Sequence, residues 1–314
     1  IDYASVSKTN PQLVYVDITA YGSKGHMADM PGFDLIVQGY TGAVASEGKI
    51  TKNGQPEVVW SSSYIDFSTG YAAANGILAG IIGRGKTGKG QLVSTSLLAN
   101  AIAMQSLRIA DVEGIPAPAK TWFEQTRPGL IEQGASYEEI QDSYQIAVRP
   151  LIYRCYYRAY KTLDGGLALG TLAVHARARL LDVFGLKDPR VTDPSYDDTT
   201  PEATRIGHEL VSKFEDTFAS KSTDHWFKEL RSHDIPCEPL RFIEEMVDDE
   251  QVLANDYVIE VDHHTGHKIR TSGPILTFGG GMPELKSSPA LGEHTGEILT
   301  DLGLSSGEIA ELDA

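Results

Sequence analysis

Cysteine, long apolar runs and surplus positive charge are scarce in this 314-residue sequence. Its two cysteines, Cys155 and Cys237, stand far apart in apolar stretches, so we expect buried thiols in a reducing cytoplasm rather than a disulfide framework. No apolar run approaches the roughly 18 residues of a membrane-spanning helix, and no basic-then-apolar leader opens the chain. The sequence therefore predicts a cytoplasmic protein without a membrane partner.

The charge balance is strongly acidic, with a net charge of -16 and a pI near 4.9. A chain without surplus Lys and Arg cannot gain affinity by releasing counterions from phosphates, so we expect no nucleic-acid partner. The chain has 314 residues, of which 41% are hydrophobic, so it can bury a core in one large or two modest domains.

The pattern of apolar residues predicts a mixed α/β chain. β-Branched and aromatic residues at 13–19 follow the turn signal Asn10-Pro11 and indicate a buried strand. Residues 91–98 alternate like a second strand and lead into an apolar helix. Between them, the apolar spacing predicts a helix over 67–82 whose buried face would consist of Ala74, Ile77, Leu78, Ile81 and Ile82.

Residues Gly80 to Thr87 match the phosphate-loop pattern G-x-x-x-x-G-K-[ST]. A working phosphate loop lies between a strand and the N-terminus of the next helix, where backbone N–H groups converge on phosphate. Here the order is reversed, because the segment ends a helix and leads into a strand. We interpret it as a helix C-terminus followed by a tight basic turn.

Asp66 stands where the stretch SSSYIDF turns into that helix, so the sequence predicts it at the N-cap. There its carboxylate would accept from the N–H of Ser68 or Thr69, and the helix dipole would favour the ionised form. Asp is a preferred capping residue, so a structural role and a catalytic role both remain open.

Three further groups are candidates for chemistry. His263, His264 and His267 have a spacing that suits a metal only on a helix, and the intervening Thr265-Gly266 favours a hairpin turn instead, so no metal site is expected. His294 lies at a helix start and is interpreted as structural. Four tyrosines and two arginines could line a pocket for a cationic substrate or form a half-buried strand: Tyr153, Tyr156, Tyr157, Tyr160, Arg154 and Arg158.

Six segments together resemble a known family. They are NPQLVYVDITAYG, PGFDLIVQGYTG, YIDFSTGYAAANGILAGIIGRGKTGKGQLV, DIPCEPL, DDEQVLANDYV and SSPALGEHTGEILTDLGLSSGEIAEL. In this order they resemble the class III CoA-transferases of the CaiB/BaiF type, which include formyl-CoA and carnitine transferases and a divergent racemase branch. The resemblance covers nearly the whole chain, with residues 120–155 least regular against it.

The resemblance implies that Asp66 is the catalytic carboxylate of an acyl-CoA:carboxylate CoA-transferase. In the family mechanism it attacks the thioester, forms an acyl-aspartyl anhydride and then an aspartyl-CoA thioester, and the acceptor acid takes the CoA. First-turn N–H groups could stabilise the developing oxyanions. Coenzyme A or acyl-CoA would be the bound substrate, with a small carboxylic acid as its partner.

The resemblance also implies contacts near Asp66. Met30, Pro31, Gly32 and Phe33 match a stretch that contacts CoA, and Asp34 falls at an acidic substrate-binding position. Pro31 replaces a lysine of the formyl-CoA transferases, whose glycine-rich active-site loop is also missing, so formate and oxalate are not the expected substrates. The racemase branch has His-Asp where this chain has Phe33-Asp34, and Phe33 cannot act as a base, so racemisation is the less favoured activity.

The fold implied is a doubly wound α/β large domain, at 1–125 and 275–314, with a smaller mixed α+β domain at 126–274, in an interlocked dimer. Family members carry about a hundred further residues before the segment that opens this chain, and these hold much of the CoA nucleotide. A cut product, one half of a tandem pseudo-dimer, and a subunit of a heteromer remain open. The alternative function is a non-catalytic half of such an assembly.

Overall fold

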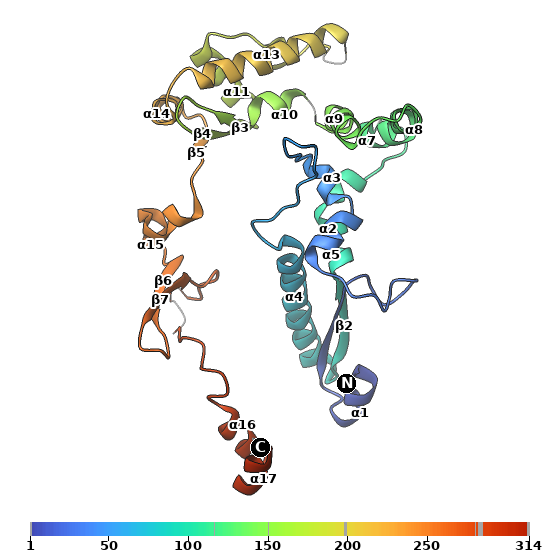
Figure 1. Ribbon diagram of the computed structural model, residues 1–314, viewed down its shortest axis with the longest axis vertical. Coiled ribbons are helices and arrows are strands. Elements are labelled where there is room, and N and C mark those ends of the chain that lie inside the picture. The colour runs from blue at the N-terminus through green and yellow to red at the C-terminus, as the bar shows by residue number, and fades with distance from the viewer. Residues whose placement is uncertain are drawn as a thin grey trace. The chain divides into compact units, whose positions relative to one another are not determined.

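The computed structural model describes residues 2–115, 117–149, 151–197, 200–279, 281 and 285–312. The chain divides into two compact units, Ile1–Cys155 and Tyr156–Ala314, and Figure 1 labels most of their elements. The expected domain boundaries near residues 125 and 275 concern the whole family fold and stay a prediction. The helices and strands of the first unit are α1 Tyr3–Thr9, β1 Val14–Thr19, α2 Asp34–Tyr40, α3 Ala43–Glu47, α4 Tyr64–Thr87, β2 Gln91–Ser96, α5 Leu97–Met104, α6 Ser106–Ile109, α7 Pro118–Thr121, the π-helix Trp122–Thr126, α8 Arg127–Glu132, α9 Tyr137–Val148 and, crossing into the second unit, α10 Leu151–Tyr156.

The first unit is organised around two parallel strands. β1 and β2 pair in register from Val14 opposite Gln91 to Thr19 opposite Ser96, which confirms both predicted strands. Parallel neighbours need a crossover connection, and here the connection contains α2, α3 and α4. The mixed α/β character is therefore confirmed, whereas the doubly wound order of a larger sheet stays a prediction.

Helix α4 packs along both strands, as Figure 1 shows. The face it buries differs from the predicted one. A methyl group on Gly80 would stand 2.6 Å from Val14 Cγ1, and one on Gly76 would stand 2.6 Å from Val93 Cγ1. Because these glycines let the helix backbone approach the strands, the small-residue face is buried and the large apolar face is exposed. The residues wrongly predicted to be buried are Ala74, Ile77, Leu78, Ile81 and Ile82.

The C-terminus of α4 explains the phosphate-loop match. Residues 80–87 are helical, and Gly88 ends the helix in the left-handed conformation with φ 69°. Its N–H donates to the Arg84 carbonyl over 2.8 Å. The next element is β2, so this glycine-rich segment precedes a strand and not a helix N-terminus. The interpretation that this segment ends a helix and leads into a strand is confirmed, but the helix continues to Thr87 instead of ending near residue 82, so Lys86 and Thr87 are helical and the turn begins at Gly88.

The second unit has an antiparallel sheet, β3-β4-β5, with an aromatic core beside it. Phe218 stacks on Tyr160 at 4.4 Å between ring centroids and meets Phe184 and Trp226 edge-on. Tyr160 and Phe218 are both almost fully buried. The elements of this unit are β3 Tyr157–Lys161, β4 Gly166–Gly170, α11 Val174–Phe184, α12 Pro189–Thr192, α13 Pro201–Ala219, α14 Thr223–Ser232, β5 Cys237–Pro239, the 3-10 helix Ile243–Asp248, α15 Glu250–Ala254, β6 Val258–Asp262, β7 Lys268–Ser272, α16 Thr295–Asp301 and α17 Ser306–Leu312.

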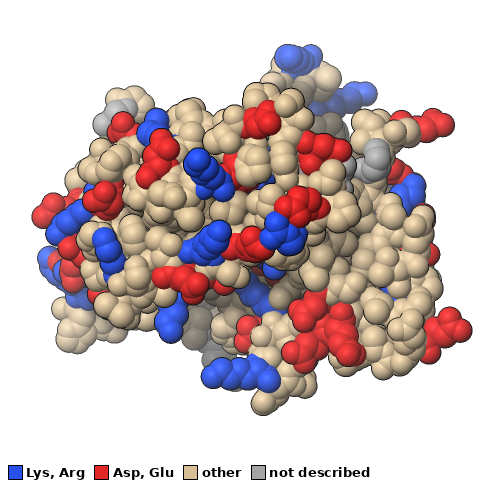
Figure 2. Space-filling model, turned by 90° about the horizontal axis from the view of Figure 1, so that it is seen from above, with Lys and Arg blue, Asp and Glu red and all other residues tan. Residues whose placement is uncertain are grey.

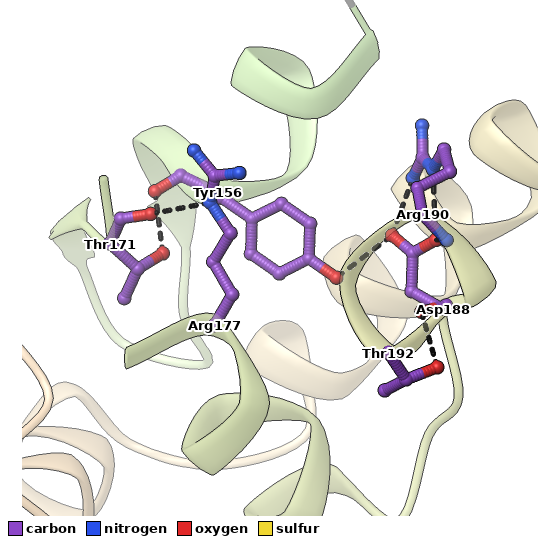
Figure 3. A network of polar contacts seen from close by, with 6 residues as sticks. All are labelled: Tyr156, Thr171, Arg177, Asp188, Arg190 and Thr192. Carbon is purple, nitrogen blue, oxygen red and sulfur yellow. Dashed lines mark hydrogen bonds and ion pairs between the residues drawn. The ribbon is translucent and has the colours of Figure 1, made fainter. Parts of the chain in front are cut away.

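A buried polar network joins the start of this unit to α12 (Figure 3). The Asp188 carboxylate accepts from the Tyr156 hydroxyl over 2.9 Å and forms a two-pronged ion pair with Arg190, at 2.9 and 2.7 Å. Thr171 donates to the Tyr156 carbonyl, and Arg177 lies over the Tyr156 ring. Since Asp188 is fully buried, these partners compensate the desolvation of its charge.

The tyrosine set divides between two elements. Tyr156 and Tyr160 are buried in the core of the second unit, whereas Tyr153 and Tyr157 are about half exposed. The first part of the segment is helix α10 and only the second part is strand β3, so the predicted strand begins four residues later than the alternation indicated.

The histidine cluster lies in the turn between β6 and β7. His263 N–H donates to the His267 carbonyl over 2.7 Å, which confirms the hairpin interpretation. Across the described ranges, no group of three or more His, Cys, Asp and Glu side chains stands close enough to hold a metal ion. His294 directly precedes α16, as expected for a helix start.

Burial bears out the expectation for the cysteines. Cys155 and Cys237 are both buried, and loss of hydration raises the pKa of the Cys237 thiol to about 11.

On the face shown in Figure 2, basic and acidic side chains are interspersed. Within the described part of the chain, no helix combines the length and hydropathy needed to cross a membrane.

Candidate active site

Helix α4 begins earlier than the sequence indicated. Its first residue is Tyr64 and its N-cap is Ser63, so Asp66 occupies the third helical position and is not the cap. The hydroxyls of Ser68 and Thr69 donate to the Ile65 carbonyl. The predicted capping role of Asp66 is therefore wrong, and its exposed carboxylate has no capping duty.

Asp34 supplies the cap from another helix. Its Oδ2 accepts from the backbone N–H of Ile65 over 2.8 Å and from that of Asp66 over 3.2 Å. These are the second and third N–H groups of α4, which an N-cap side chain would normally satisfy. With an acceptor 31 residues away in sequence, α4 can start at Tyr64 although the Ser63 side chain makes no capping hydrogen bond.

A small apolar cluster supports this helix start. Ile65 and Val37 are fully buried and pack with Tyr21 and Ala101, and Tyr64 lies against the same cluster. Burial of Ile65 fixes the rotation of the first turn of α4. Asp66, one residue further along, consequently points away from the core and is exposed.

The site lies at the carboxyl edge of the parallel strands. Gly80 of α4 faces Val14 at the start of β1, whereas Gly76 faces Val93 further along β2, so α4 runs opposite to the strands. Its N-terminus with Asp66 is therefore at the edge where both strands end. In open α/β sheets this is the edge at which ligands bind.

The predicted CoA-contact segment reaches the same edge. A methyl group on Gly32 would stand 2.7 Å from Ala20 Cβ, directly after β1 ends, so the chain passes close to the strand end here. Met30 and Phe33 are 50% and 73% exposed, and Pro31 is exposed as well. Phe33 precedes Asp34, which places its backbone within about 11 Å of the Asp66 N atom. Contacts of these residues with CoA stay a prediction.

Asp34 itself is only 6% exposed. Its Oδ1 accepts from Gln38 Nε2 over 2.5 Å, while Oδ2 is shared by the two N–H groups of α4. Both oxygens of the Asp34 carboxylate are thus bound to partners within this chain. The contact of Asp34 with substrate stays a prediction. The sequence analysis missed Gln38, although its position four residues after Asp34 places both on one helix face.

The electrostatics of the site follow from two neighbouring carboxylates. Burial raises the pKa of the Asp66 carboxyl above its ordinary value, and the charge of Asp34 raises it further. The side chain as a whole remains exposed, so its loss of hydration is only partial and water screens the charge of Asp34. Burial also raises the pKa of the Tyr64 hydroxyl, together with the charges of Asp34 and Glu47.

The first-turn N–H groups of α4 already have acceptors. Tyr64 donates to the Ser62 carbonyl, Phe67 to the Ser63 carbonyl, and the two between them to Asp34. The expectation that these groups stabilise an oxyanion is therefore wrong for this structure. Stabilisation of developing charge at Asp66 needs other donors.

Comparison with known proteins identifies the family. The model of CoA-transferase family III matches residues 1–295, so the chain belongs to this family of enzymes. It is 28% identical to a cinnamoyl-CoA:phenyllactate CoA-transferase of Clostridium sporogenes, over 100% of this chain and 70% of the relative. It is also 28% identical to a succinyl-CoA:glutarate CoA-transferase of Mus musculus, over 99% of this chain and 65% of the relative.

A solved structure extends the likeness to the fold. A CAIB/BAIF family protein from Brucella suis superposes with a TM-score of 0.64 at 20% identity, over 96% of this chain and 71% of that protein. This chain therefore has the fold of part of a class III CoA-transferase, and it spans about two thirds of the relatives' length.

Proposed function

We propose that the protein transfers coenzyme A from an acyl-CoA donor to a small carboxylic acid, with Asp66 as the nucleophile. The observation that carries this proposal is the exposed Asp66 carboxylate on the first turn of α4, at the carboxyl edge of β1 and β2, released from capping by Asp34. Family membership supports the reaction class.

The proposed reaction begins when an Asp66 carboxylate oxygen attacks the thioester carbonyl carbon. The C–S bond breaks, CoA leaves as thiolate, and a mixed anhydride forms on Asp66. The thiolate then attacks the aspartyl carbonyl, which releases the donor acid and leaves an aspartyl-CoA thioester. The acceptor carboxylate repeats these steps in reverse order, and Asp66 regains its carboxylate. No external oxidant or metal enters this balance.

The raised pKa of Asp66 suits such a nucleophile. A more basic carboxylate is a stronger nucleophile once it is ionised, and Asp34 supplies a neighbouring negative charge that favours release of the Asp66 charge into a covalent bond. The ionised form is still required, so formation of the adduct should increase as the pH rises through the Asp66 pKa.

A trapping experiment tests the assignment. The chain is incubated with cinnamoyl-CoA or succinyl-CoA and treated with hydroxylamine, which converts an aspartyl anhydride or thioester into a hydroxamate, and the peptides are then sequenced by mass spectrometry. We expect the hydroxamate on the peptide containing Tyr64–Phe67. Asp66→Asn should abolish it and lower transfer by about 10³-fold or more.

A matched control separates chemistry from general loss of charge. Glu57→Gln changes an exposed carboxylate in the segment that leads to α4, and it should leave the labelling unchanged. Retention of the label by Asp66→Asn, or its appearance on another peptide, would refute the role of Asp66.

A second candidate function is supported by the exposed apolar face of α4. Leu78 and Ile82 are 58% and 64% exposed, which is typical of surfaces that another protein segment covers. On this reading the chain supplies the Asp66 part of a tandem or heteromeric transferase, in which other elements complete the CoA site. Acyl-CoA binding measured by calorimetry distinguishes the two, because this candidate requires a partner for binding.

A further inference from the structure

The side chain of Gln38 joins two segments that the sequence keeps apart. It is 1% exposed on α2, and its amide pairs with the backbone of Val59, in the segment that leads to α4. Gln38 Oε1 accepts from the Val59 N–H over 3.1 Å, and Nε2 donates to the Val59 carbonyl over 3.2 Å. Since a backbone N–H can only donate, Val59 fixes which end of the amide is oxygen.

The same Nε2 also donates to Asp34 Oδ1 over 2.5 Å. The other Asp34 oxygen accepts from the N–H groups of Ile65 and Asp66. A continuous line of hydrogen bonds therefore runs from the Val59 backbone through Gln38 and Asp34 to the backbone of Asp66. Gln38 and Asp34 are held by burial on α2, and Asp66 is held by its place in α4.

We propose that Gln38 is a positioning residue for Asp66. By holding the Asp34 carboxylate on the N–H groups of the first turn of α4, it fixes both where the Asp66 carboxylate stands and how close the Asp34 charge lies to it. This inference rests on the proposed function of Asp66. It assigns a role to a buried residue that acts on Asp66 through Asp34.

The chemistry of the amide makes this role specific. Gln38 has to donate to Asp34 while it accepts from Val59, and only a side chain with both groups at this length does so. Methionine is similar in size but offers neither group. Ionised glutamate can accept from the Val59 N–H but cannot donate to Asp34, and it adds a like charge beside it. Protonated glutamate restores the bonds to Asp34 and to the Val59 N–H, although its single O–H leaves the Val59 carbonyl without the bond that Nε2 makes.

The pKa of Asp66 can be measured to test this role, because a substitution that only loosens the packing would leave that pKa unchanged. The charged and titratable groups around Asp66 are Asp34 on α2, Tyr64 on its own helix, and Glu47 on α3, which acts on Tyr64. Part of the raised pKa of Asp66 comes from the Asp34 charge. Release of Asp34 should therefore lower the pKa of Asp66, toward its ordinary value.

The test compares Gln38→Met and Gln38→Glu with the native chain. The rate of hydroxamate formation at Asp66 is measured across the pH range, and the Asp66 carboxyl carbon is titrated by ¹³C NMR without substrate. We expect Gln38→Met to slow labelling about 10- to 100-fold at every pH and to move the Asp66 titration to lower pH. In Gln38→Glu, Asp66 should be labelled at nearly the native rate at low pH. Labelling should then slow as the introduced carboxyl group ionises, so the plot of rate against pH should have a descending limb that the plot for the native chain lacks.

The control is Gln141→Met, which removes another buried glutamine of the same unit. Gln141 Nε2 donates to the Ala45 carbonyl and has no bond to Asp34 or α4. It should lower stability without moving either pH profile. An unchanged profile and titration in both Gln38 variants, or equal effects from Gln141→Met, would overturn the proposal.

The two hypotheses fail in different ways. If the native chain forms no adduct, the proposed function falls, and the Asp66 titration still decides the role of Gln38. If the native chain is labelled and the Gln38 variants behave like it, only the positioning role falls. Should Gln38→Met not fold, the pH-dependent loss in Gln38→Glu carries the test.

Discussion

Asp66 shows how a remote side chain changes the meaning of a local pattern. Asp at the start of an apolar helix is typical of an N-cap, yet α4 begins at Tyr64 and Asp34 accepts from its free N–H groups. The Asp66 side chain is thereby left without a structural hydrogen bond to the helix start. The residue that the sequence could assign to either structure or catalysis is available for chemistry.

The pKa of Asp66 predicts how stability depends on pH. The pKa of Asp66 is higher in the folded chain than in the unfolded chain, so the protonated carboxyl group stabilises the fold. This stability is fully present below the unfolded pKa of about 3.9 and is lost as the pH rises through the folded pKa. Asparagine does not titrate, so Asp66→Asn should gain stability relative to the native chain toward neutral pH.

Thermal melting at intervals between about pH 4 and about pH 7 checks this expectation. The melting temperatures of the two proteins should converge at the acidic end and separate toward neutrality, with the variant higher. A variant that becomes progressively less stable than the native chain as the pH rises would contradict the sign of the Asp66 shift.

At the scale of single elements, α4 is placed by its glycines. Large residues predicted to face the core are exposed, since Gly76 and Gly80 bring the backbone against Val93 and Val14. Helical periodicity identified the helix correctly but could not tell which of its two apolar faces meets the strands. That choice depends on the shape of the strand surface, which is formed by residues distant in sequence.

Gly80→Ala should destabilise the first unit by about 1–3 kcal/mol, because the added methyl would overlap the stiff, β-branched side chain of Val14. Urea unfolding followed by circular dichroism measures the change. Gly85→Ala on the same helix is the matched control, since no atom lies within 4 Å of its new Cβ.

The control should be stabilised by about 0.5–1 kcal/mol, because alanine restricts the unfolded chain more than glycine does. If Gly80→Ala were as stable as Gly85→Ala, the close approach of α4 to β1 would be wrong.

At the scale of the whole molecule, the chain consists of two units with separate cores. In the first, Val37 and Ile65 anchor the candidate site, whereas the second depends on aromatic packing around Phe218. The site residues from Met30 to Asp66 all belong to the first unit. Stability of the second unit can therefore be tested with substitutions that leave the candidate site intact.

Phe218→Ala should destabilise the second unit by about 3–5 kcal/mol, since it leaves a cavity between Tyr160, Phe184 and Trp226. Fluorine-labelled tryptophan gives a resonance for Trp226 whose urea midpoint reports on this unit. Phe242→Ala, at a side chain that is 77% exposed, should change the free energy of unfolding of this unit by no more than about 0.5 kcal/mol. Equal midpoints for the two variants would contradict the importance of this aromatic cluster.

The sequence by itself determined that strands lie near 13–19 and 91–98, that a helix lies between them, that residues 80–87 do not form a phosphate loop, and the family. These features depend on local backbone preferences, side-chain periodicity and the order of short motifs, all of which act over neighbouring residues. Only the tertiary structure decided where α4 starts, which face it buries and what Asp34 and Gln38 do. Those outcomes depend on hydrogen bonds and contacts between segments 21 to 66 residues apart, such as Gln38 with Val59 and Val14 with Gly80, which no local pattern encodes.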